Sequence, residues 1–447
     1  MTDTMTFSDL NLNTPLLNAL NDLGYTQPTP IQEKVFSVMM SGQDVLGIAQ
    51  TGTGKTFAYL LPMLRQWKYT KDVNPQILIL VPTRELVVQV EREAKKLTAY
   101  MNAVTLGVYG GTNIKTQIEA VLDGVDILVA TPGRLLDLAL NGSLRLKSVK
   151  KLVLDEVDEM LGLGFRSQLT RILDLLPAKR QNLLFSATTT EEVELFMDEH
   201  FNAPVTIEAA PTGAPLENIA QSAYRVPNFN TKLHLLEILL NDPEMTKVLV
   251  FAGTKSLADQ LHKAMDEKFP DQVGVVHSNK DQNYRFNTVR KFRDGEHLVL
   301  IATDLIARGL DIFEVTHVIN FDTPDVPENY IHRIGRTGRA EKQGRSITLV
   351  ADRETEYREA IEQLMEYQIP EAELPAELVI STQLTAEEMP QFRMKNIDVK
   401  LPKRENVGAA FHEKKEKNKK VNMKLTRAEQ MKLKYKKPKT RGQKKKR

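Results

Sequence analysis

Short apolar runs rich in Val, Ile and Leu recur along the chain and alternate with longer amphipathic stretches. Runs of this length between helical patterns are typical of strands buried on both faces of a parallel sheet. They fall into two sets, and each set predicts one doubly wound α/β domain. The first set is Asp44–Ala49, Gln76–Pro82, Asp126–Ala130, Lys151–Asp155 and Asn182–Ser186. The second set is Lys247–Ala252, Gln272–His277, Leu298–Ala302, His317–Phe321 and Arg345–Val350.

Two domains also suit the length of the chain, because one core rarely grows beyond about 250–300 residues and this chain has 447. A stretch with two prolines and a glycine at residues 209–218 predicts a linker. We therefore expect a first domain over residues 1–208 and a second over residues 219–370. Residues 371–447 are expected to be a largely disordered extension and tail.

Charge is divided unevenly along the chain, although the formal net charge is only +2. Residues 401–447 hold 19 Lys and Arg against 4 Asp and Glu, whereas residues 1–400 hold 41 against 54. A basic tail on an acidic body favours binding of a polyanion, and a solubilising tail is the alternative. Within the tail, Thr426-Arg427-Ala428-Glu429 has the form of a capping box and predicts a short helix to about Tyr435.

The sequence excludes some classes of protein. No run of about 18 apolar residues is present, so no membrane span is expected. Met1–Leu10 lacks the pattern of a signal peptide. The absence of cysteine excludes disulfides and thiolate metal sites and fits a reducing compartment. We therefore expect a cytoplasmic location.

A glycine-rich loop directly follows the first predicted strand and opens a helical pattern. It reads Ala49-Gln50-Thr51-Gly52-Thr53-Gly54-Lys55-Thr56, with Ala49 where the strict phosphate-loop pattern has Gly. Gly52 and Gly54 allow a tight turn whose N–H groups point at phosphate oxygens. Lys55 can reach the β- and γ-phosphates, and the Thr56 hydroxyl can ligate Mg²⁺. A structural glycine turn is the alternative, and the strand–loop–helix context favours a nucleotide site.

An acidic cluster, Asp155-Glu156-Val157-Asp158, lies at the end of the predicted strand Lys151–Asp155. The carboxyl ends of parallel strands border the ligand crevice of such sheets. One carboxylate there can hold Mg²⁺, and a second can orient and deprotonate an attacking water. An acidic helix N-terminus, favoured by the helix dipole, is the alternative. Together with the phosphate loop, the cluster indicates an NTPase.

The order of these and further motifs from about Phe7 to Val350 resembles that of the DEAD-box ATP-dependent RNA helicases. The resemblance implies two tandem RecA-like domains, ATP and Mg²⁺ as cofactors, RNA bound through its backbone, and a core that acts as a monomer. The segment Gly24–Gln32 resembles the Q motif, with Tyr25 stacking on the adenine and Gln32 reading its edge. The resemblance implies these ATP contacts: Phe7, Tyr25, Gln32, Thr51, Gly52, Thr53, Gly54, Lys55, Thr56 and Asp311.

The resemblance also assigns catalytic and coupling roles. Lys55, Asp155 and Glu156 are implied in catalysis from the first domain, with Thr56 and Asp155 on Mg²⁺. Arg336 and Arg339, in His332–Arg339, are implied to face the γ-phosphate from the second domain. An arginine supplied in this way raises rates by about 10³–10⁵. The implied coupling residues between nucleotide and domain closure are Asp158, Ser186, Thr188 and His332.

RNA contacts are implied at several strand ends, where each motif alone reads as an ordinary turn or loop. They are Pro82, Thr83, Arg84, Gly110, Gly111, Thr131, Gly133, Arg134 and Thr303. Asp311 is implied to contact ribose. Three positions depart from the family pattern: Val157 replaces Ala in the acidic motif, Ser278 replaces Gly after His277, and Ile306 replaces a small residue. We expect function to survive the change at Val157, whereas the role of the loop at Ser278 is less defined.

We therefore predict an RNA helicase that uses ATP for local, non-processive unwinding or remodelling. A slow-hydrolysing RNA clamp or assembly scaffold is one alternative, and a DNA translocase with the same two-domain core is another. A core with few additions to its two domains and a basic tail are similar to those of the RhlE-type bacterial branch, which suggests ribosome assembly or RNA turnover.

Overall fold

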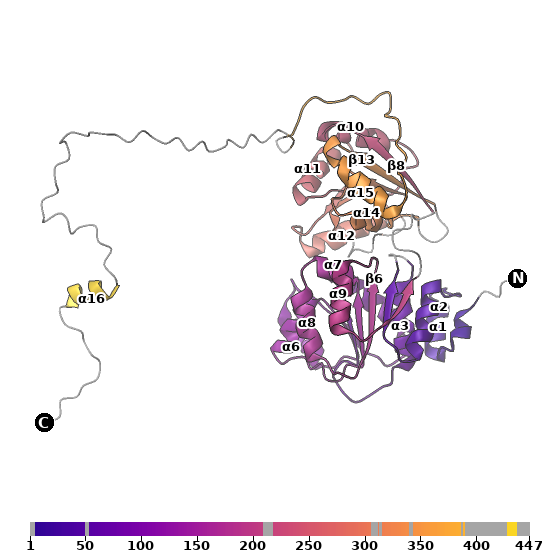
Figure 1. Ribbon diagram of the computed structural model, residues 1–447, viewed down its shortest axis with the longest axis vertical. Coiled ribbons are helices and arrows are strands. Elements are labelled where there is room, and N and C mark those ends of the chain that lie inside the picture. Colours follow the sequence, from indigo (N-terminus) through magenta and orange to yellow (C-terminus); the bar gives the residue numbers. More distant parts are fainter. Residues whose placement is uncertain are drawn as a thin grey trace. The chain divides into compact units, whose positions relative to one another are not determined.

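The computed structural model describes residues 5–49, 53–208, 218–304, 312, 315–338, 343–385, 388 and 427–435. The chain divides into two compact units, Met1–Met389 and Pro390–Arg447. The first unit contains two parallel sheets, each with its helices (Figure 1). We call residues 5–208 the first lobe and residues 218–388 the second lobe. The predicted fold class, two parallel-sheet α/β domains, is confirmed.

The first lobe is built on a sheet in the order β3-β4-β2-β5-β6-β1-β7, with every neighbouring pair parallel. Its strands are β1 Val45–Ile48, β2 Ile77–Leu80, β3 Thr105–Val108, β4 Ile127–Ala130, β5 Lys151–Asp155, β6 Gln181–Ser186 and β7 Val205–Glu208. Its helices are η1 Phe7–Leu10, α1 Thr14–Asp22, α2 Pro30–Met40, α3 Lys55–Gln66, α4 Arg84–Leu97, α5 Ile114–Leu122, α6 Pro132–Leu140, α7 Val157–Gly162, α8 Arg166–Leu175 and α9 Glu191–His200.

Alternate residues of these strands enter two separate cores. Ile77 and Ile79 pack with residues of α1 to α4 on one face, whereas Leu78 and Leu80 pack with residues of α5 to α9 on the other. This is the consequence of the two-residue repeat of a strand covered on both sides. It explains why the central strands read as continuous apolar runs.

The second lobe is built on a sheet in the order β10-β11-β9-β12-β13-β8, again parallel throughout. Without β7, the first sheet has the same winding order. The strands are β8 Ile219–Arg225, β9 Val248–Phe251, β10 Val273–Val276, β11 Val299–Ala302, β12 His317–Asn320 and β13 Gly344–Val350. The helices are α10 Phe229–Leu240, α11 Lys255–Asp266, α12 Gln282–Arg293, α14 Pro327–Ile334, η2 Asp352–Glu354 and α15 Thr355–Met365.

Three strands were not predicted: β3, β7 and β8. Each of them lies at an edge of its sheet. These three strands are covered less completely, so their sequences mix polar with apolar residues and lack a continuous apolar run, whereas the edge strand β10 is buried along its length and was predicted. In β8, for example, buried residues alternate with exposed or half-buried ones.

The prediction that the second domain ends near residue 370 and is followed by a disordered extension is wrong for residues 371–385 and 388. We call these residues the C-terminal strap. Ala372 N–H donates to Ala223 O of β8 at 2.8 Å. Asn228 Nδ2 donates to Ser381 O at 2.6 Å, and Phe229 N–H donates to Glu388 Oε1 at 2.6 Å. Backbone hydrogen bonds and caps hold a stretch that lacks a periodic apolar pattern, so the sequence did not reveal it.

The basic tail contains helix α16, Arg427–Tyr435, so the predicted short helix is confirmed. Thr426, its predicted cap, lies outside the described residues. Among the residues that the structure describes, no helix combines the length and apolar character that a bilayer crossing requires.

Candidate nucleotide and RNA site

The phosphate loop joins β1 to α3, and Lys55 is the first residue of the helix. Gly54 has φ +92°, a left-handed conformation that favours glycine. A Cβ at this position would lie 2.4 Å from Gln32 Nε2, so the close approach also requires glycine. Thr51 and Gly52, predicted phosphate contacts, lie outside the described residues.

The Q-motif residues hold this loop. Thr29 Oγ1 donates to Thr53 O at 2.8 Å. Gln32 Nε2 donates to Gly54 O at 3.2 Å, and its Oε1 accepts from Thr29 N–H at 3.0 Å. These bonds use one N–H and one lone pair of the Gln32 amide, which has two of each. Gln32 therefore couples the loop to α2 and retains capacity to read an adenine edge.

Two aromatic residues predicted to contact adenine differ in exposure. Tyr25 is 49% exposed and packs edge-on against Phe57 of α3, with ring centroids 5.3 Å apart. Phe7 is 4% exposed and belongs to the core beneath α1 to α4. The structure thus gives Tyr25 a surface on which a base can stack and places Phe7 in a supporting position.

Buried charges meet at the carboxyl ends of β1 and β5. Lys55, Asp155 and Glu156 are each less than 9% exposed. Burial raises the pKa of Glu156 to about 7, whereas the charges of Lys55 and Arg336 act to lower it. Burial also raises the pKa of Asp155, with Lys55 again opposing the rise. Within the described part of the chain, Lys55 Nζ and Glu156 Oε2 are buried without a hydrogen-bond partner.

The backbone of Glu156 adopts the left-handed conformation, with φ 55° and ψ 54°. Non-glycine residues rarely take this conformation, and such strain is concentrated at functional sites. It allows Glu156 to cap α7 while Asp155 ends β5, so that two consecutive carboxylates reach the same edge of the sheet. Val157, the departure from the family pattern, is fully buried in the core on the α5 to α9 face.

Tyr59 is a site residue that the sequence analysis missed. It lies one helical turn after Lys55 on α3, is fully buried, and donates from its hydroxyl to Asp155 Oδ2 at 3.0 Å. Burial raises its pKa well above the usual value, so it stays a donor. The i+4 spacing from Lys55 was the available signal, since it places both side chains on one face of the helix.

The predicted coupling residues meet around one carboxylate. Asp158 Oδ2 accepts hydrogen bonds from Ala187 N–H at 3.2 Å, Thr188 N–H at 3.1 Å and Thr188 Oγ1 at 3.0 Å. Ser186 Oγ donates to Thr188 O at 2.7 Å. His332 Nε2 of the second lobe lies 3.9 Å from the same oxygen. The acidic motif, the motif after β6 and the second lobe therefore converge here.

Of the two arginines predicted to face the nucleotide, Arg336 is 2% exposed, and its charge acts on Glu156 across the lobes. Arg339 and Asp311 lie outside the described residues. A further contact between lobes, not predicted, joins Arg285 Nη1 of α12 to Glu85 Oε1 of α4 at 2.5 Å, with both side chains buried. Spacing along the sequence carries no signal for such a long-range pair.

The predicted RNA residues lie at the carboxyl ends of strands. A Cβ on Gly111 would lie 2.0 Å from Arg84 Nη1, so the Gly110-Gly111 turn packs closely on this guanidinium. Arg134 is buried and donates to Gln117 Oε1 at 2.6 Å and Thr112 O at 3.0 Å. In this structure Arg134 braces the neighbouring loop.

The remaining predicted RNA residues share positions at strand ends or helix starts. Thr83 caps α4 by accepting from Leu86 N–H at 3.3 Å, and Thr303 follows β11. At the Ser278 departure, His277 is buried and its Nε2 lies 2.9 Å from Asp259 Oδ1. Pro82, Thr131 and Gly133 complete the set after β2 and β4, and Ile306 lies outside the described residues.

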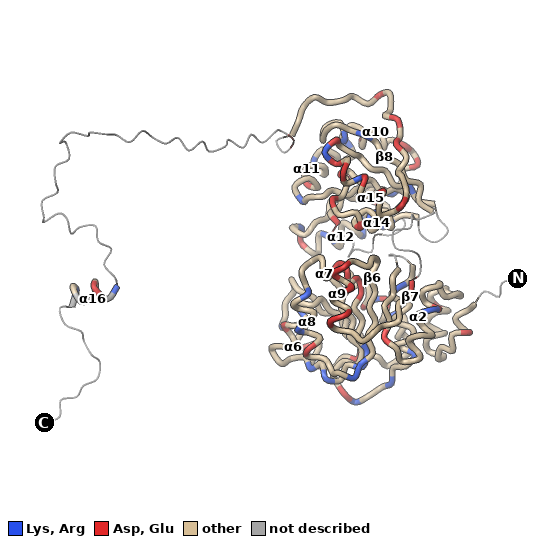
Figure 2. Tube along the Cα trace, viewed as in Figure 1, with Lys and Arg blue, Asp and Glu red and all other residues tan. Residues whose placement is uncertain are grey.

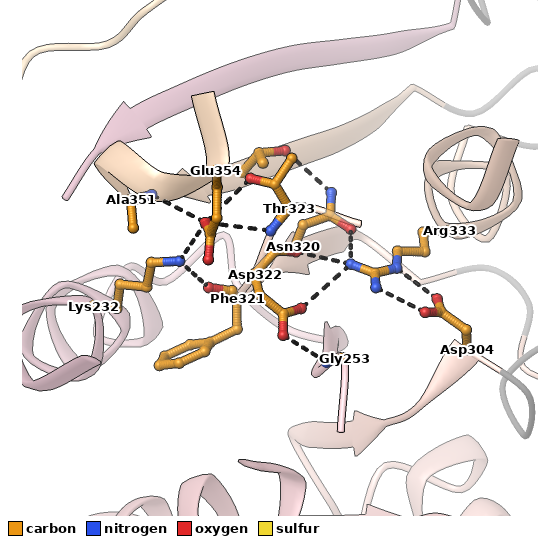
Figure 3. Close-up of polar contacts among 11 residues, drawn as sticks. Lys232, Gly253, Asp304, Asn320, Phe321, Asp322, Thr323, Arg333, Ala351 and Glu354 are labelled. Atoms are coloured by element: carbon orange, nitrogen blue, oxygen red, sulfur yellow. Dashed lines mark hydrogen bonds and ion pairs between the residues drawn. The ribbon is translucent and has the colours of Figure 1, made fainter. Parts of the chain in front are cut away.

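The same edge of the second sheet carries a polar cluster whose members pair with one another (Figure 3). Lys232 Nζ of α10 donates to Glu354 Oε2 at 2.8 Å and to Phe321 O at 2.9 Å. Arg333 forms two hydrogen bonds with the Asp304 carboxylate, at 2.6 and 2.8 Å. Lys232 lies in the first turn of α10, the helix after β8, whereas Lys55 is the first residue of α3, the helix after β1.

The residues of the first lobe fit a triphosphate and its divalent cation. The buried, unpartnered Nζ of Lys55 suits a phosphate oxygen, because leaving it without a partner is costly. The Thr56 hydroxyl and the Asp155 carboxylate are the hard oxygen ligands that Mg²⁺ prefers.

Comparisons with known proteins agree with this geometry. Residues 29–196 match the DEAD/DEAH box helicase family, and residues 231–341 match the helicase conserved C-terminal domain. The ATP-dependent RNA helicase CshA of Listeria monocytogenes is 41% identical over 360 residues, covering 80% of this chain and 68% of the relative. The DEAD-box ATP-dependent RNA helicase RhpA of Helicobacter pylori is 40% identical, covering 79% and 71%.

Solved structures show the same architecture. Mss116p bound to single-stranded RNA and AMP-PNP has a TM-score of 0.77 at 27% identity, covering 84% of this chain and 81% of that one. S. cerevisiae Dbp5 bound to RNA and ADP BeF3 has a TM-score of 0.75 at 29% identity, covering 82% and 95%. Fold and site thus define a two-lobed nucleotide-binding helicase core. The chain belongs to the DEAD-box family of ATP-dependent RNA helicases.

Proposed function

We propose that the chain couples RNA-stimulated ATP hydrolysis to local, non-processive unwinding or remodelling of RNA duplexes and RNA–protein complexes. One observation supports this coupling above all: His332 Nε2, in the second lobe, lies 3.9 Å from Asp158 Oδ2 of the acidic motif in the first, and the charge of Arg336 acts to lower the pKa of Glu156. A hydrolytic site that needs charge from both lobes is complete only when the lobes are together. Ligands that span both lobes therefore control the reaction.

Each residue of the site has a role in this proposal. Lys55 binds the β- and γ-phosphates, and Thr56 and Asp155 would hold Mg²⁺, which neutralises phosphate charge when bound. Glu156 orients the attacking water and accepts its proton, a role that suits a carboxylate whose pKa lies near 7. Arg336 and Arg339 stabilise the negative charge on the transferring group. Asp158, Ser186, Thr188 and His332 transmit closure of the lobes.

RNA is the proposed ligand across the carboxyl edges of both sheets. Thr83, Thr131 and Thr303 offer hydroxyls, and Arg84 a guanidinium, for phosphates and sugars. Such contacts carry little sequence information, so binding is largely sequence-independent. Contacts to the ribose hydroxyl would distinguish RNA from DNA. The basic tail at residues 401–447 adds non-specific, salt-sensitive anchoring.

The cellular role can be proposed in general terms. We propose a cytoplasmic protein with a monomeric core that acts in ribosome assembly or RNA turnover, as the similarity of its tail to the RhlE-type branch suggests. CshA and RhpA are named as RNA helicases from bacteria, which supports an RNA substrate.

Replacing Glu156 with Gln tests the proposal. The amide keeps the shape and removes the proton acceptor, so RNA-stimulated ATPase should fall by about 10²–10⁴-fold. Binding of ATP and RNA should persist, as measured by fluorescence titration. Glu194→Gln, an exposed change on α9, is the matched control and should leave ATPase unchanged. Near-normal RNA-stimulated turnover in Glu156→Gln would refute the assignment.

A further inference from the structure

The amino edge of the first sheet carries a dense basic surface. Residues 65–76, 141–151 and 176–182 contain the loops that precede β2, β5 and β6, with the adjoining ends of α3, β5 and β6, and together we call these segments the basic rim. They contain nine Lys and Arg and one Asp or Glu, although residues 1–400 as a whole are acidic. Figure 2 shows these blue segments gathered along the loops of the first lobe near α6 and α8.

The three loops form one surface, because their strands are neighbours in the sheet and hydrogen bonds link the loops. Lys150 N–H donates to Gln76 O at 2.8 Å, and Lys150 Nζ donates to Gln76 Oε1 at 2.9 Å. Gln181 N–H donates to Lys150 O at 2.9 Å. Lys151 Nζ contacts both Gln66 and Gln181. The loops that carry the charges are therefore held in place relative to one another.

The single acid of the basic rim offsets only one of its nine positive charges. The Asp72 carboxylate accepts hydrogen bonds from Ser148 Oγ and from the backbone and side chain of Asn74. These hydrogen bonds lower the pKa of Asp72. Lys68 and Lys147 are exposed, so the positive potential of the rim faces solvent.

Aromatic groups lie among these charges. Tyr69, between Lys68 and Lys71, is 68% exposed. Trp67, Lys68, Lys150 and Lys151 line a shallow cavity of about 80 Å³. In the described part of the chain, the Trp67 indole N–H has no hydrogen-bond partner. Lysines for phosphates together with aromatic faces for bases form the usual surface for single-stranded nucleic acid.

The basic rim is separate from the proposed catalytic edge. Residues such as Thr83 and Glu156 follow the carboxyl ends of β2 and β5, whereas the rim loops precede the amino ends of the same strands. Strands of four to six residues separate the two edges by about 13–20 Å. The same few nucleotides cannot contact both.

We propose that the basic rim is a second RNA-binding surface, which holds a segment of the substrate outside the strand bound at the carboxyl edges. This inference rests on the proposed function only because it takes RNA to be the polyanion that the basic rim binds. It gives long or structured RNA an additional, sequence-independent attachment to the first lobe. The salt dependence of binding should reflect the phosphates that the rim neutralises.

The test uses the full chain with one exposed lysine changed in each loop: Lys68→Gln, Lys147→Gln and Lys179→Gln together. Lys34→Gln, Lys95→Gln and Lys96→Gln, exposed on α2 and α4, are the matched control with the same change in charge. Affinity is measured by fluorescence anisotropy for a short RNA of about 10 nucleotides and for a long single strand of about 40, over a range of salt concentrations.

The rim variant should lose about ten-fold in affinity for the long RNA, and its salt slope should fall by about 2. Its affinity for the short RNA, its ATPase with saturating short RNA and its melting temperature should match the control. Tyr69→Ala should weaken long RNA alone by several-fold. Unchanged binding of long RNA, or an equal loss for both lengths, would overturn the inference.

Two further outcomes have defined meanings. If a poly-glutamate peptide binds the wild-type rim and the rim variant loses that binding but retains long RNA, the surface serves an acidic protein and the inference is wrong. If no RNA stimulates wild-type ATPase, the proposed function fails, whereas the rim is still judged by the anisotropy of the long RNA.

Discussion

The two lobes share one winding order but treat their charges in opposite ways. At the carboxyl edge of the first sheet, Lys55 Nζ and Glu156 Oε2 are buried without a hydrogen-bond partner among the described residues. At the same edge of the second sheet, Lys232 is paired with Glu354 and Arg333 with Asp304. In the second lobe, carboxylates of the same lobe pair with the buried cations, whereas in the first lobe a ligand phosphate would pair with Lys55.

The difference shows how one fold supports two roles. A buried charge without a partner lowers the stability of a folded lobe, and a bound ligand of opposite charge removes this cost. Binding of nucleotide phosphates to Lys55 therefore stabilises the first lobe. The second lobe pairs Lys232 and Arg333 with its own carboxylates and carries Arg336 just after α14. The comparison predicts that equivalent substitutions affect activity in the first lobe and stability in the second.

The largest effect is expected for Arg336→Ala. This change removes the charge that the second lobe directs at Glu156, so RNA-stimulated ATPase should fall by about 10³-fold or more. ATP affinity should stay within a few-fold, since Lys55 and the phosphate loop remain. Single-turnover hydrolysis with saturating RNA is the measurement. Stimulation that survives would show that the second lobe does not complete the site.

A smaller effect, on stability, is expected for Glu354→Ala. Lys232 would remain buried without its partner, and breaking such a pair costs about 3–5 kcal/mol. Denaturant unfolding should show this loss, while ATP affinity stays unchanged. Glu359→Ala, exposed on the neighbouring helix α15, is the control and should be near neutral. Equal stability of the two variants would contradict the role given to the cluster.

The smallest effect is expected for Tyr59→Phe. It removes the hydroxyl that donates to Asp155 at 3.0 Å and keeps the ring packed against Phe185. A hydrogen bond to a charged group contributes about 1.5–3 kcal/mol. Without it, Asp155 is held less firmly, and nucleotide binding should need several-fold more Mg²⁺. A Mg²⁺ titration of nucleotide affinity that matches wild type would exclude this positioning role.

The buried centre of each sheet could be predicted from the sequence, because strands covered on both faces leave continuous apolar runs such as Lys151–Asp155. The edge strands β3, β7 and β8 could not, because they lack a continuous apolar run. The C-terminal strap could not either, since backbone hydrogen bonds and caps such as Asn228 to Ser381 leave no periodic pattern. Local motifs likewise located the phosphate loop and the acidic cluster.

Contacts between segments that are distant in the sequence were the part of the site that could not be predicted. Tyr59 reaches Asp155 across 96 residues, and Arg285 reaches Glu85 between lobes. Neither pair has a fixed spacing. The i+4 spacing from Lys55 indicated on which face of α3 Tyr59 lies, but only the folded chain reveals its partner Asp155. The ion pair between Lys232 and Glu354 in the second lobe could not be predicted for the same reason, because Lys232 has the sequence pattern of an ordinary helix lysine.

The central claim is that Lys55 of the first lobe is available to bind nucleotide, whereas Lys232 of the second lobe is paired with a carboxylate of its own lobe. Calorimetric ATP binding and denaturant unfolding of Lys55→Met and Lys232→Met test it directly. Lys55→Met should lose ATP binding by at least about ten-fold and lose less stability than Lys232→Met, because Lys55 Nζ has no hydrogen bond to another described residue that the change would break. Lys232→Met should keep ATP affinity and lose about 3–5 kcal/mol of stability. The reverse pattern, or ATP binding unchanged in Lys55→Met, would contradict the account.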